Sequence, residues 1–109
     1  MEIKIEQKTG YAVVVVIGRL VAASSEEFRT HVAETLETCP NIVCDLSQMT
    51  HIDSSGLGVL VRLLQQCKAQ GGKCRLAALQ SHPRIVFDIT KVYTVFEIFE
   101  TVEDAVRGW

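Results

Sequence analysis

Two hydroxyl groups and two glycines lie together in the segment Asp53-Ser54-Ser55-Gly56-Leu57-Gly58, directly before an apolar stretch with helical spacing. The side chains of Asp53, Ser54 and Ser55 are all of the type that caps the N-terminus of a helix. One cap is enough, and each glycine costs on the order of 1 kcal/mol relative to alanine inside a helix. Capping therefore leaves the two glycines unexplained, whereas close approach of another backbone would explain them.

A serine in this segment is also a candidate for phosphorylation. The phosphate would lie against unsatisfied backbone N–H groups at the positive end of a helix, so we expect the fold to tolerate it. It would add close to two negative charges beside Asp53 on an exposed surface. A partner that packs there would be expelled. The segment therefore predicts that phosphorylation of a serine controls the binding of a partner through added negative charge.

Enzymatic chemistries fit the residues poorly. Ser55 lacks the Gly-x-Ser-x-Gly frame of a hydrolase nucleophile, and the three histidines occupy no recognisable places in a triad. Gly71-Gly72-Lys73-Cys74 lacks the upstream glycine and the hydroxyl residue of a phosphate-binding loop. Gly56-Leu57-Gly58 lacks the third glycine of a dinucleotide fingerprint. We therefore expect neither catalysis nor a metal or other cofactor.

The cysteines are Cys39, Cys44, Cys67 and Cys74, and their spacing matches neither zinc sites nor redox motifs. Free and mostly buried thiols are the favoured interpretation. Disulfides between Cys39 and Cys44 or between Cys67 and Cys74 remain open alternatives.

Length and charge restrict the class of protein. The chain has 109 residues, 48% of them hydrophobic, which predicts one domain over residues 1–109 with one core. The net charge is −2, and Lys and Arg are scattered singly, so no basic stripe favours direct binding of nucleic acid. The start alternates charged with apolar residues, unlike a secretory signal, and the longest apolar run, Ala12–Ile17, is too short to span a bilayer. We expect a cytoplasmic protein without membrane insertion.

The N-terminal part of the chain predicts two strands and a helix. Ile3 and Ile5 alternate with charged residues, which is typical of a half-exposed edge strand. Tyr11–Ile17 is apolar and β-branched on both faces, and this predicts a central strand covered on both sides. Ser24 begins a Ser-x-x-Glu capping box, which predicts that a helix starts there and continues until Pro40 stops it.

The middle of the chain predicts a strand followed by the helix that carries the serine segment. Asn41–Leu46 has the composition of a short buried strand, and residues 47–54 are mostly polar. From Gly56 onward, helical spacing assigns an inner face to Leu57, Leu60, Val61 and Leu64. Gly71-Gly72 ends this helix.

Two further apolar residues of this helix, Val59 and Leu63, fall on its other side together with Arg62 and Gln66. They need a cover. Either a neighbouring helix of the same domain or a partner protein would supply it, and the sequence leaves both alternatives open.

The remaining elements are predicted in the order strand, helix, strand and short helix, over Lys73–Leu79, Ser81–Ile89, Phe96–Phe99 and Thr101–Val106. Ile85, Val86 and Ile89 are the expected inner side of the longer helix. Ala105 and Val106 are expected to face inward from the short one. Two strands followed by alternating helices and strands favour an α/β domain, a mixed sheet with helices packed against it.

Five motifs spread over nearly the whole length form a recognisable set: Gly18-Arg19-Leu20, Cys44-Asp45-Leu46-Ser47, residues 52–60, Gly71-Gly72 and residues 96–105. On these residues the chain resembles the STAS domain family, and within it the anti-sigma factor antagonists. It implies a mixed sheet of four to five strands with about four helices packed mainly on one face. One departure is Lys91, which stands where family members often have glycine, so we expect a differently shaped helix end there.

The resemblance also implies a regulatory cycle. The unphosphorylated protein binds an anti-sigma factor and frees the sigma factor; the anti-sigma factor, an ATP-dependent serine kinase, then phosphorylates the serine before the motif glycine, and a phosphatase resets it. By position, the phosphorylated residue is Ser55. The implied partner surface comprises Asp53, Ser54, Ser55, Gly56, Leu57, Gly58, Val59, Arg62 and Leu63. On its own, the protein is expected to be a monomer or weak dimer.

Two other functions remain open. One is a constitutive STAS subunit of a transporter ATPase or of another regulatory complex, in which the serine segment docks without being phosphorylated. The other is binding of a small molecule or nucleotide by the domain itself.

Overall fold

The computed structural model describes residues 1–109. Its strands are β1 (Glu2–Gln7), β2 (Ala12–Leu20), β3 (Ile42–Ile52), β4 (Cys74–Ala77) and β5 (Glu97–Phe99). Its helices are α1 (Ala22–Thr38), α2 (Ser54–Ala69), α3 (Ser81–Thr90) and α4 (Val102–Ala105), with the 3₁₀ helix η1 (Val92–Thr94). The strands form one sheet in the order β1-β2-β3-β4-β5, with β1 antiparallel and the rest parallel. The predicted mixed α/β fold is confirmed.

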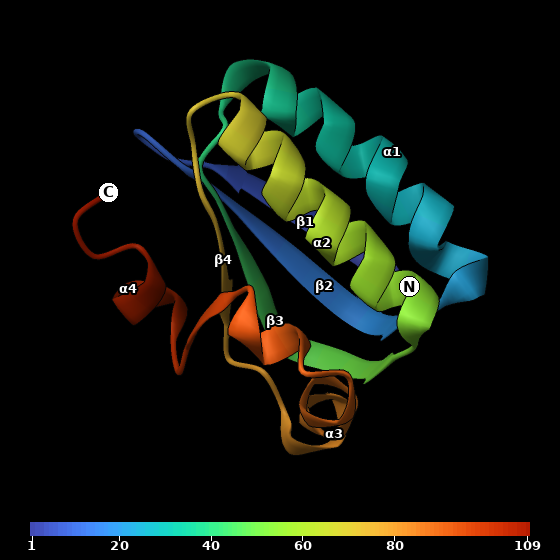
Figure 1. Ribbon diagram of the computed structural model, residues 1–109. Coiled ribbons are helices and arrows are strands. Elements are labelled where there is room, and N and C mark those ends of the chain that lie inside the picture. The colour runs from blue at the N-terminus through green and yellow to red at the C-terminus, as the bar shows by residue number, and fades with distance from the viewer.

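The helices cover the sheet unequally. α1 and α2 lie side by side over one face, while the short α4 lies on the opposite face (Figure 1). The larger core cluster joins α1, α2 and Phe87 of α3 to side chains of β2 and β3. The second cluster is small and consists of Val13, Val43, Ala77 and Ala105. The expectation of helices mainly on one face is confirmed.

This unequal cover changes the environment expected for β2. Val14 and Val16 are fully buried under the helices. On the other face Val13 is buried, but Val15 and Ile17 are only half-buried. The prediction of a strand covered on both sides is therefore only partly right, because α4 has four residues and covers only part of that face.

β3 is longer than the sequence indicates. The polar residues after Leu46 continue the strand to Ile52, with Met49 and Ile52 buried. They pair in parallel with the end of β2, where register shifts interrupt regular alternation. A distant partner strand supplies the backbone hydrogen bonds, which a local hydrophobic pattern does not reveal.

α1 begins earlier than predicted. Its N-cap is Val21, and Ser24 is the third residue of the helix. The Ser24 hydroxyl accepts a hydrogen bond from the backbone N–H of Val21 at 3.0 Å and donates one to the carbonyl of Arg19 at 2.7 Å. Ser24 therefore secures the first turn from inside the helix, and its prediction as the N-cap is wrong. The helix ends at Thr38, before Pro40, as expected.

α2 ends at the predicted glycines for two different reasons. Gly71 has φ of +81°, the left-handed conformation that glycine favours. Gly72 passes so close to Pro40 that a Cβ would lie 2.3 Å from its carbonyl oxygen. The second glycine is thus required by a contact with the loop between α1 and β3.

α3 presents a different face to the core from the one predicted. Pro83 and Phe87 are buried and Val86 is half-buried. Ile85 and Ile89, predicted to face inward, are 54% and 76% exposed. The helix offers two apolar faces, and packing selects the one with the proline and the aromatic ring.

Lys91 ends α3 in the left-handed conformation, with φ of 58°. The helix end thus has the backbone geometry for which glycine is suited, and the lysine bears strain of about 1 kcal/mol. We expect Lys91→Gly to raise the free energy of unfolding by about 0.5 kcal/mol, because strain relief outweighs the entropy cost of glycine. Urea denaturation would measure this. Lys91→Ala, which keeps the strain, is the control, and equal stability of both variants would contradict the prediction.

Candidate functional site

The centre of the site is Asp53, the N-cap of α2. One carboxylate oxygen, Oδ1, accepts a hydrogen bond from the backbone N–H of Gly56 at 3.0 Å. The other, Oδ2, accepts one from the N–H of Ala22, the first residue of α1, at 3.1 Å. A single carboxylate therefore caps two helices and ties their starts together beside the ends of β2 and β3 (Figure 1).

These contacts favour the ionised carboxylate. The backbone N–H of Gly56, followed by that of Ala22, lowers the pKa of Asp53 below its ordinary value. Asp53 therefore places a negative charge at the start of α2 at neutral pH. This second capping role has no local signal, because Ala22 lies 31 positions away in the sequence.

Ser54 and Ser55 occupy the first turn of α2, directly after this cap. Ser54 is exposed and Ser55 half-buried. Neither hydroxyl takes part in a hydrogen bond within the chain, because the helix start is already capped by Asp53. Both hydroxyls are therefore uncommitted at the positive end of a helix, where a phosphate is electrostatically favoured.

The two glycines of the segment, Gly56 and Gly58, differ in what surrounds them. A Cβ on Gly56 would lie 2.2 Å from the carbonyl oxygen of Leu20 and 2.7 Å from Cγ1 of Ile52. Gly56 thus lets α2 approach the end of β2, as the close-approach interpretation requires. Gly58 is exposed and has nothing within 4 Å of a Cβ position. The fold explains the first glycine and leaves the second without an internal reason.

The structure removes three residues from the expected partner surface, Gly56, Leu57 and Leu63, since all three are buried. Leu57 and Leu63 are 4% and 2% exposed. Leu63 faces the groove between α2 and α1, whose lining includes Phe28, Val32 and Leu36. Of the two covers considered for Leu63, a helix of the same domain is the one observed, so its assignment to an exposed partner surface is corrected.

The other expected residues stay accessible to different degrees. Ser54, Gly58 and Arg62 are exposed, and Asp53, Ser55 and Val59 are partly exposed. The accessible surface at the start of α2 is therefore small and largely polar.

Comparison with known protein families matches the STAS domain to residues 2–105. The chain belongs to the STAS domain family. The match includes every strand and helix of the fold and the whole of the Asp53–Gly58 segment. The recognition made from the sequence motifs is thereby confirmed.

Curated relatives of this STAS chain are named as antagonists of anti-sigma factors. The anti-sigma-B factor antagonist of Bacillus subtilis is 25% identical, with 98% of each chain covered. The anti-sigma F factor antagonist of Paenibacillus polymyxa is 23% identical, over 96% of this chain and 92% of its own. Both relatives are thus named for their action on an anti-sigma factor.

Solved structures share the fold of this STAS chain. An anti-sigma factor antagonist from Mycobacterium paratuberculosis has a TM-score of 0.87 at 21% identity, covering 97% of this chain and 91% of its own. The phosphorylated form of the Bacillus cell fate determinant SpoIIAA has a TM-score of 0.75 at 19% identity, covering 97% of each. A sulfate transporter family protein from Wolinella succinogenes has a TM-score of 0.78 at 13% identity, covering 92% and 84%.

The cysteines of this STAS chain are all free, and Cys44, Cys67 and Cys74 are buried. Neither disulfide left open by the sequence is formed. The contact with the Cys74 thiol, followed by burial, raises the pKa of Cys67 well above its usual range. The Cys44 thiol acts in the same direction on the pKa of Cys74. The thiols of Cys67 and Cys74 therefore stay protonated, and the three buried cysteines pack as core residues.

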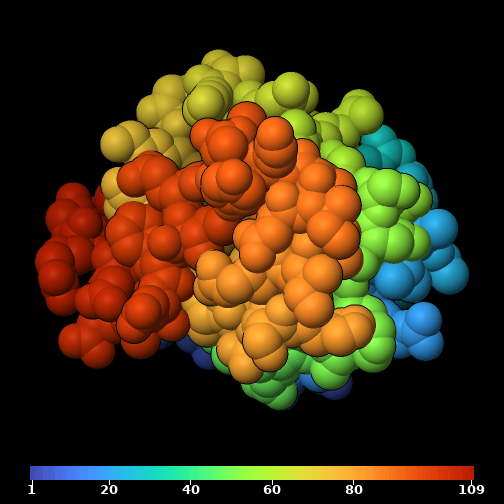
Figure 2. Space-filling view, turned by 60° about the horizontal axis from the view of Figure 1, so that its bottom comes forward, coloured from blue at the N-terminus to red at the C-terminus, as the bar shows by residue number.

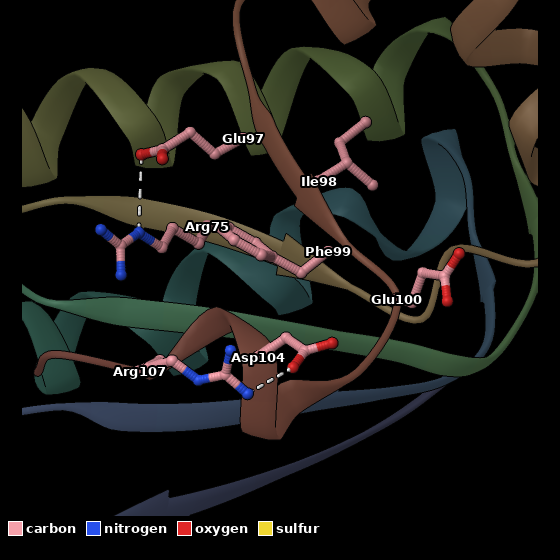
Figure 3. A pocket seen from close by; sticks show the side chains of 7 residues that line it. All are labelled: Arg75, Glu97, Ile98, Phe99, Glu100, Asp104 and Arg107. Atoms are coloured by element: carbon pink, nitrogen blue, oxygen red, sulfur yellow. Dashed lines mark hydrogen bonds and ion pairs between the residues drawn. The ribbon is translucent and has the colours of Figure 1, made fainter.

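A second depression, open to solvent, lies beside β5 and α4 on the far side of the sheet (Figure 3). The Arg75 guanidinium lies 4.4 Å from the ring centre of Trp109 and donates to the carbonyl of Ala105 at 2.9 Å. It also pairs with Glu97 at 3.5 Å. Arg75 thus fastens the C-terminal segment to the sheet through its Nε and Nη1 donors.

The structure also bears on metal binding and on membrane insertion. No cluster of three or more His, Cys, Asp or Glu side chains is arranged to hold a metal ion. None of the helices has the length and apolar character that crossing a membrane requires.

Proposed function

We propose that this STAS protein is a cytoplasmic anti-sigma factor antagonist that is switched off by phosphorylation of Ser55. The observation that carries the proposal is the uncommitted Ser55 hydroxyl in the first turn of α2, beside an Asp53 carboxylate that two helix starts hold in place. The names of the curated relatives support an anti-sigma factor as the partner.

The unphosphorylated form binds through the start of α2. Gly58 allows a partner backbone to approach without obstruction, because no Cβ projects there and no atom of this chain fills the space. Exposed Ser54 and Arg62 provide polar contacts around it. Binding occupies the anti-sigma factor, and the sigma factor is released.

Phosphorylation ends this binding by adding negative charge to the docking surface. The anti-sigma factor transfers the γ-phosphoryl group of ATP to the Ser55 oxygen, with loss of the hydroxyl proton and formation of ADP. The phosphate adds close to two negative charges beside ionised Asp53. The helix N-terminus tolerates it, whereas a partner packed at this point would bury it at high cost. A phosphatase removes the phosphate by hydrolysis and restores binding.

The test uses three variants with the purified anti-sigma factor kinases of the source organism. We expect a kinase and ATP to phosphorylate the wild type and Ser54→Ala but not Ser55→Ala, as measured by mass spectrometry. Ser54→Ala is the matched control, since it removes the neighbouring hydroxyl from the same turn. Ser55→Asp should bind the kinase at least about tenfold more weakly than the wild type, because its charge opposes docking.

Two results would contradict the proposal. One is binding of Ser55→Asp as tight as that of the wild type, and the other is the absence of phosphate on Ser55 with every kinase tested. Copurification of a transporter ATPase with membrane components would instead favour a constitutive assembly subunit. The fold shared with a sulfate transporter family protein is the observation behind that second candidate.

A further inference from the structure

The large exposed hydrophobic side chains of this protein are confined to one stretch of the chain. They are Ile85 and Ile89 of α3, Tyr93 of η1 and Val95, with exposures of 54%, 76%, 47% and 52%. Clustered exposed apolar side chains mark interaction sites more often than single ones do. The sequence pattern assigned Ile85 and Ile89 to the core, but α3 packs with Pro83 and Phe87 inward and leaves both isoleucines exposed.

Helical geometry places the two isoleucines on a defined flank of α3. His82, Ile85 and Ile89 have the spacing i, i+3 and i+7 and therefore share one side of the helix. Asp88, the single carboxylate of α3, follows Ile85 by three residues and lies about 60° around the helix from it, at the edge of this side. The surface formed by His82, Ile85 and Ile89 is here termed the α3 stripe.

The α3 stripe borders the serine segment. The ring of His82 lies 5.0 Å from the ring of His51, measured between centroids. His51 is at the end of β3, two residues before Asp53. Figure 2 shows the orange atoms of α3 beside the green atoms of the segment where β3 leads into α2. The His82 end of the α3 stripe therefore adjoins the residues that lead into α2.

We propose that the α3 stripe is the apolar half of the surface on which the anti-sigma factor docks. This inference rests on the function proposed above and adds to the partner surface two residues outside the serine motif, Ile85 and Ile89. The start of α2 supplies the charge switch, and the stripe supplies the apolar contact area that the small, polar surface of Ser54, Gly58 and Arg62 lacks.

The area that a stable interface requires supports docking of the anti-sigma factor on the α3 stripe. A partner of ordinary affinity covers roughly 800 Å² of each protein, which corresponds to a disc of about 16 Å radius. The Cα atoms of the chain span 32 × 26 × 23 Å. A partner centred on Ser55 therefore extends over the neighbouring α3 stripe. Interfaces place apolar anchors near the contact centre, and the contact between His51 and His82 places the start of the stripe beside the residues that lead into the motif.

The experiment uses Ile85→Gln combined with Ile89→Gln in the full chain, with Arg84→Gln as the control, because Arg84 is exposed and lies about 100° or more around the same helix from both isoleucines. Binding of the purified anti-sigma factor kinase is measured by calorimetry. We expect the double variant to bind at least about tenfold more weakly and Arg84→Gln to bind like the wild type. In Ser55 phosphorylation assays the double variant should raise KM with kcat unchanged, since the stripe contributes to docking and not to phosphoryl transfer. Its Tm should stay that of the wild type, because both side chains are exposed.

The results separate this inference from the proposed function. If the double variant binds like the wild type while Ser55→Asp loses binding, the stripe is not part of the docking surface and the switch at Ser55 stands. If the wild type binds no anti-sigma factor and Ser55 is never phosphorylated, the proposed function itself fails. If the wild type sediments as a dimer and the double variant as a monomer, the stripe binds a second copy of this chain, and the inference is overturned.

Discussion

Gly56→Ala should lower the free energy of unfolding by about 3 kcal/mol, whereas Gly58→Ala, two residues later in the same helix, should raise it by about 1 kcal/mol. The methyl group at position 56 would lie 2.2 Å from the carbonyl oxygen of Leu20. That obstacle is backbone, so relief requires α2 to move away from β2. At position 58 the methyl group meets no atom of the chain, and alanine is the better helix former.

Urea denaturation of the two variants beside the wild type measures this contrast. For a chain of this size the loss at position 56 corresponds to a Tm lower by about 12 °C or more. The two substitutions are chemically identical and serve as controls for each other. Equal effects on stability would mean that α2 does not press against β2 as the structure shows.

Gly58→Ala also distinguishes an effect on stability from an effect on binding. Gly58→Ala should weaken binding of the anti-sigma factor although the protein is more stable, because the added methyl group occupies the space into which the partner backbone packs. An affinity equal to that of the wild type would show that Gly58 has no part in docking.

Asp53→Ala should lower the free energy of unfolding by about 2 kcal/mol, since it removes the caps of two helices at about 1 kcal/mol each. Both acceptor oxygens are in use, one by Gly56 of α2 and the other by Ala22 of α1. Asp53→Asn is the matched comparison, because its amide keeps one acceptor oxygen and replaces the other with a donor. Asp53→Asn should lower the free energy of unfolding by about half as much as Asp53→Ala. Chemical denaturation at pH 7 measures both variants.

The stabilisation by Asp53 should also depend on pH with a definite sign. The hydrogen bonds from Gly56 and Ala22 hold the pKa of Asp53 in the folded chain below its ordinary value of 3.8. The contribution to stability is therefore complete above about pH 4 and is lost as the pH falls through the folded pKa. The stability difference between the wild type and Asp53→Asn should shrink over that range. A difference that stays constant from pH 7 to pH 2 would contradict the double cap.

The sequence by itself determined those elements that depend on residues close to one another along the chain. The apolar runs of β2 and of the first half of β3, the burial of Leu57, Leu60 and Leu64 and the stops at Pro40 and Gly71-Gly72 were all predictable. Val61, predicted on the same inner face of α2, is only half-buried. The Asp53–Gly58 segment could likewise be placed at a helix start after a buried strand. Each of these depends on residues within a few positions of one another, through hydrophobic periodicity, proline or left-handed glycine.

Tertiary structure decided the rest, because the deciding atoms come from distant parts of the chain. α1 begins at Ala22 because the carboxylate of Asp53 reaches it, and β3 extends to Ile52 because the end of β2 pairs with it. Leu63 is covered because α1 packs across α2. Ile85 and Ile89 remain exposed because packing buried the alternative face of α3. Sequence alone identified the serine that could carry a charge; only the packed structure shows which glycine beside it is free to meet a partner and which apolar helix flank adjoins it.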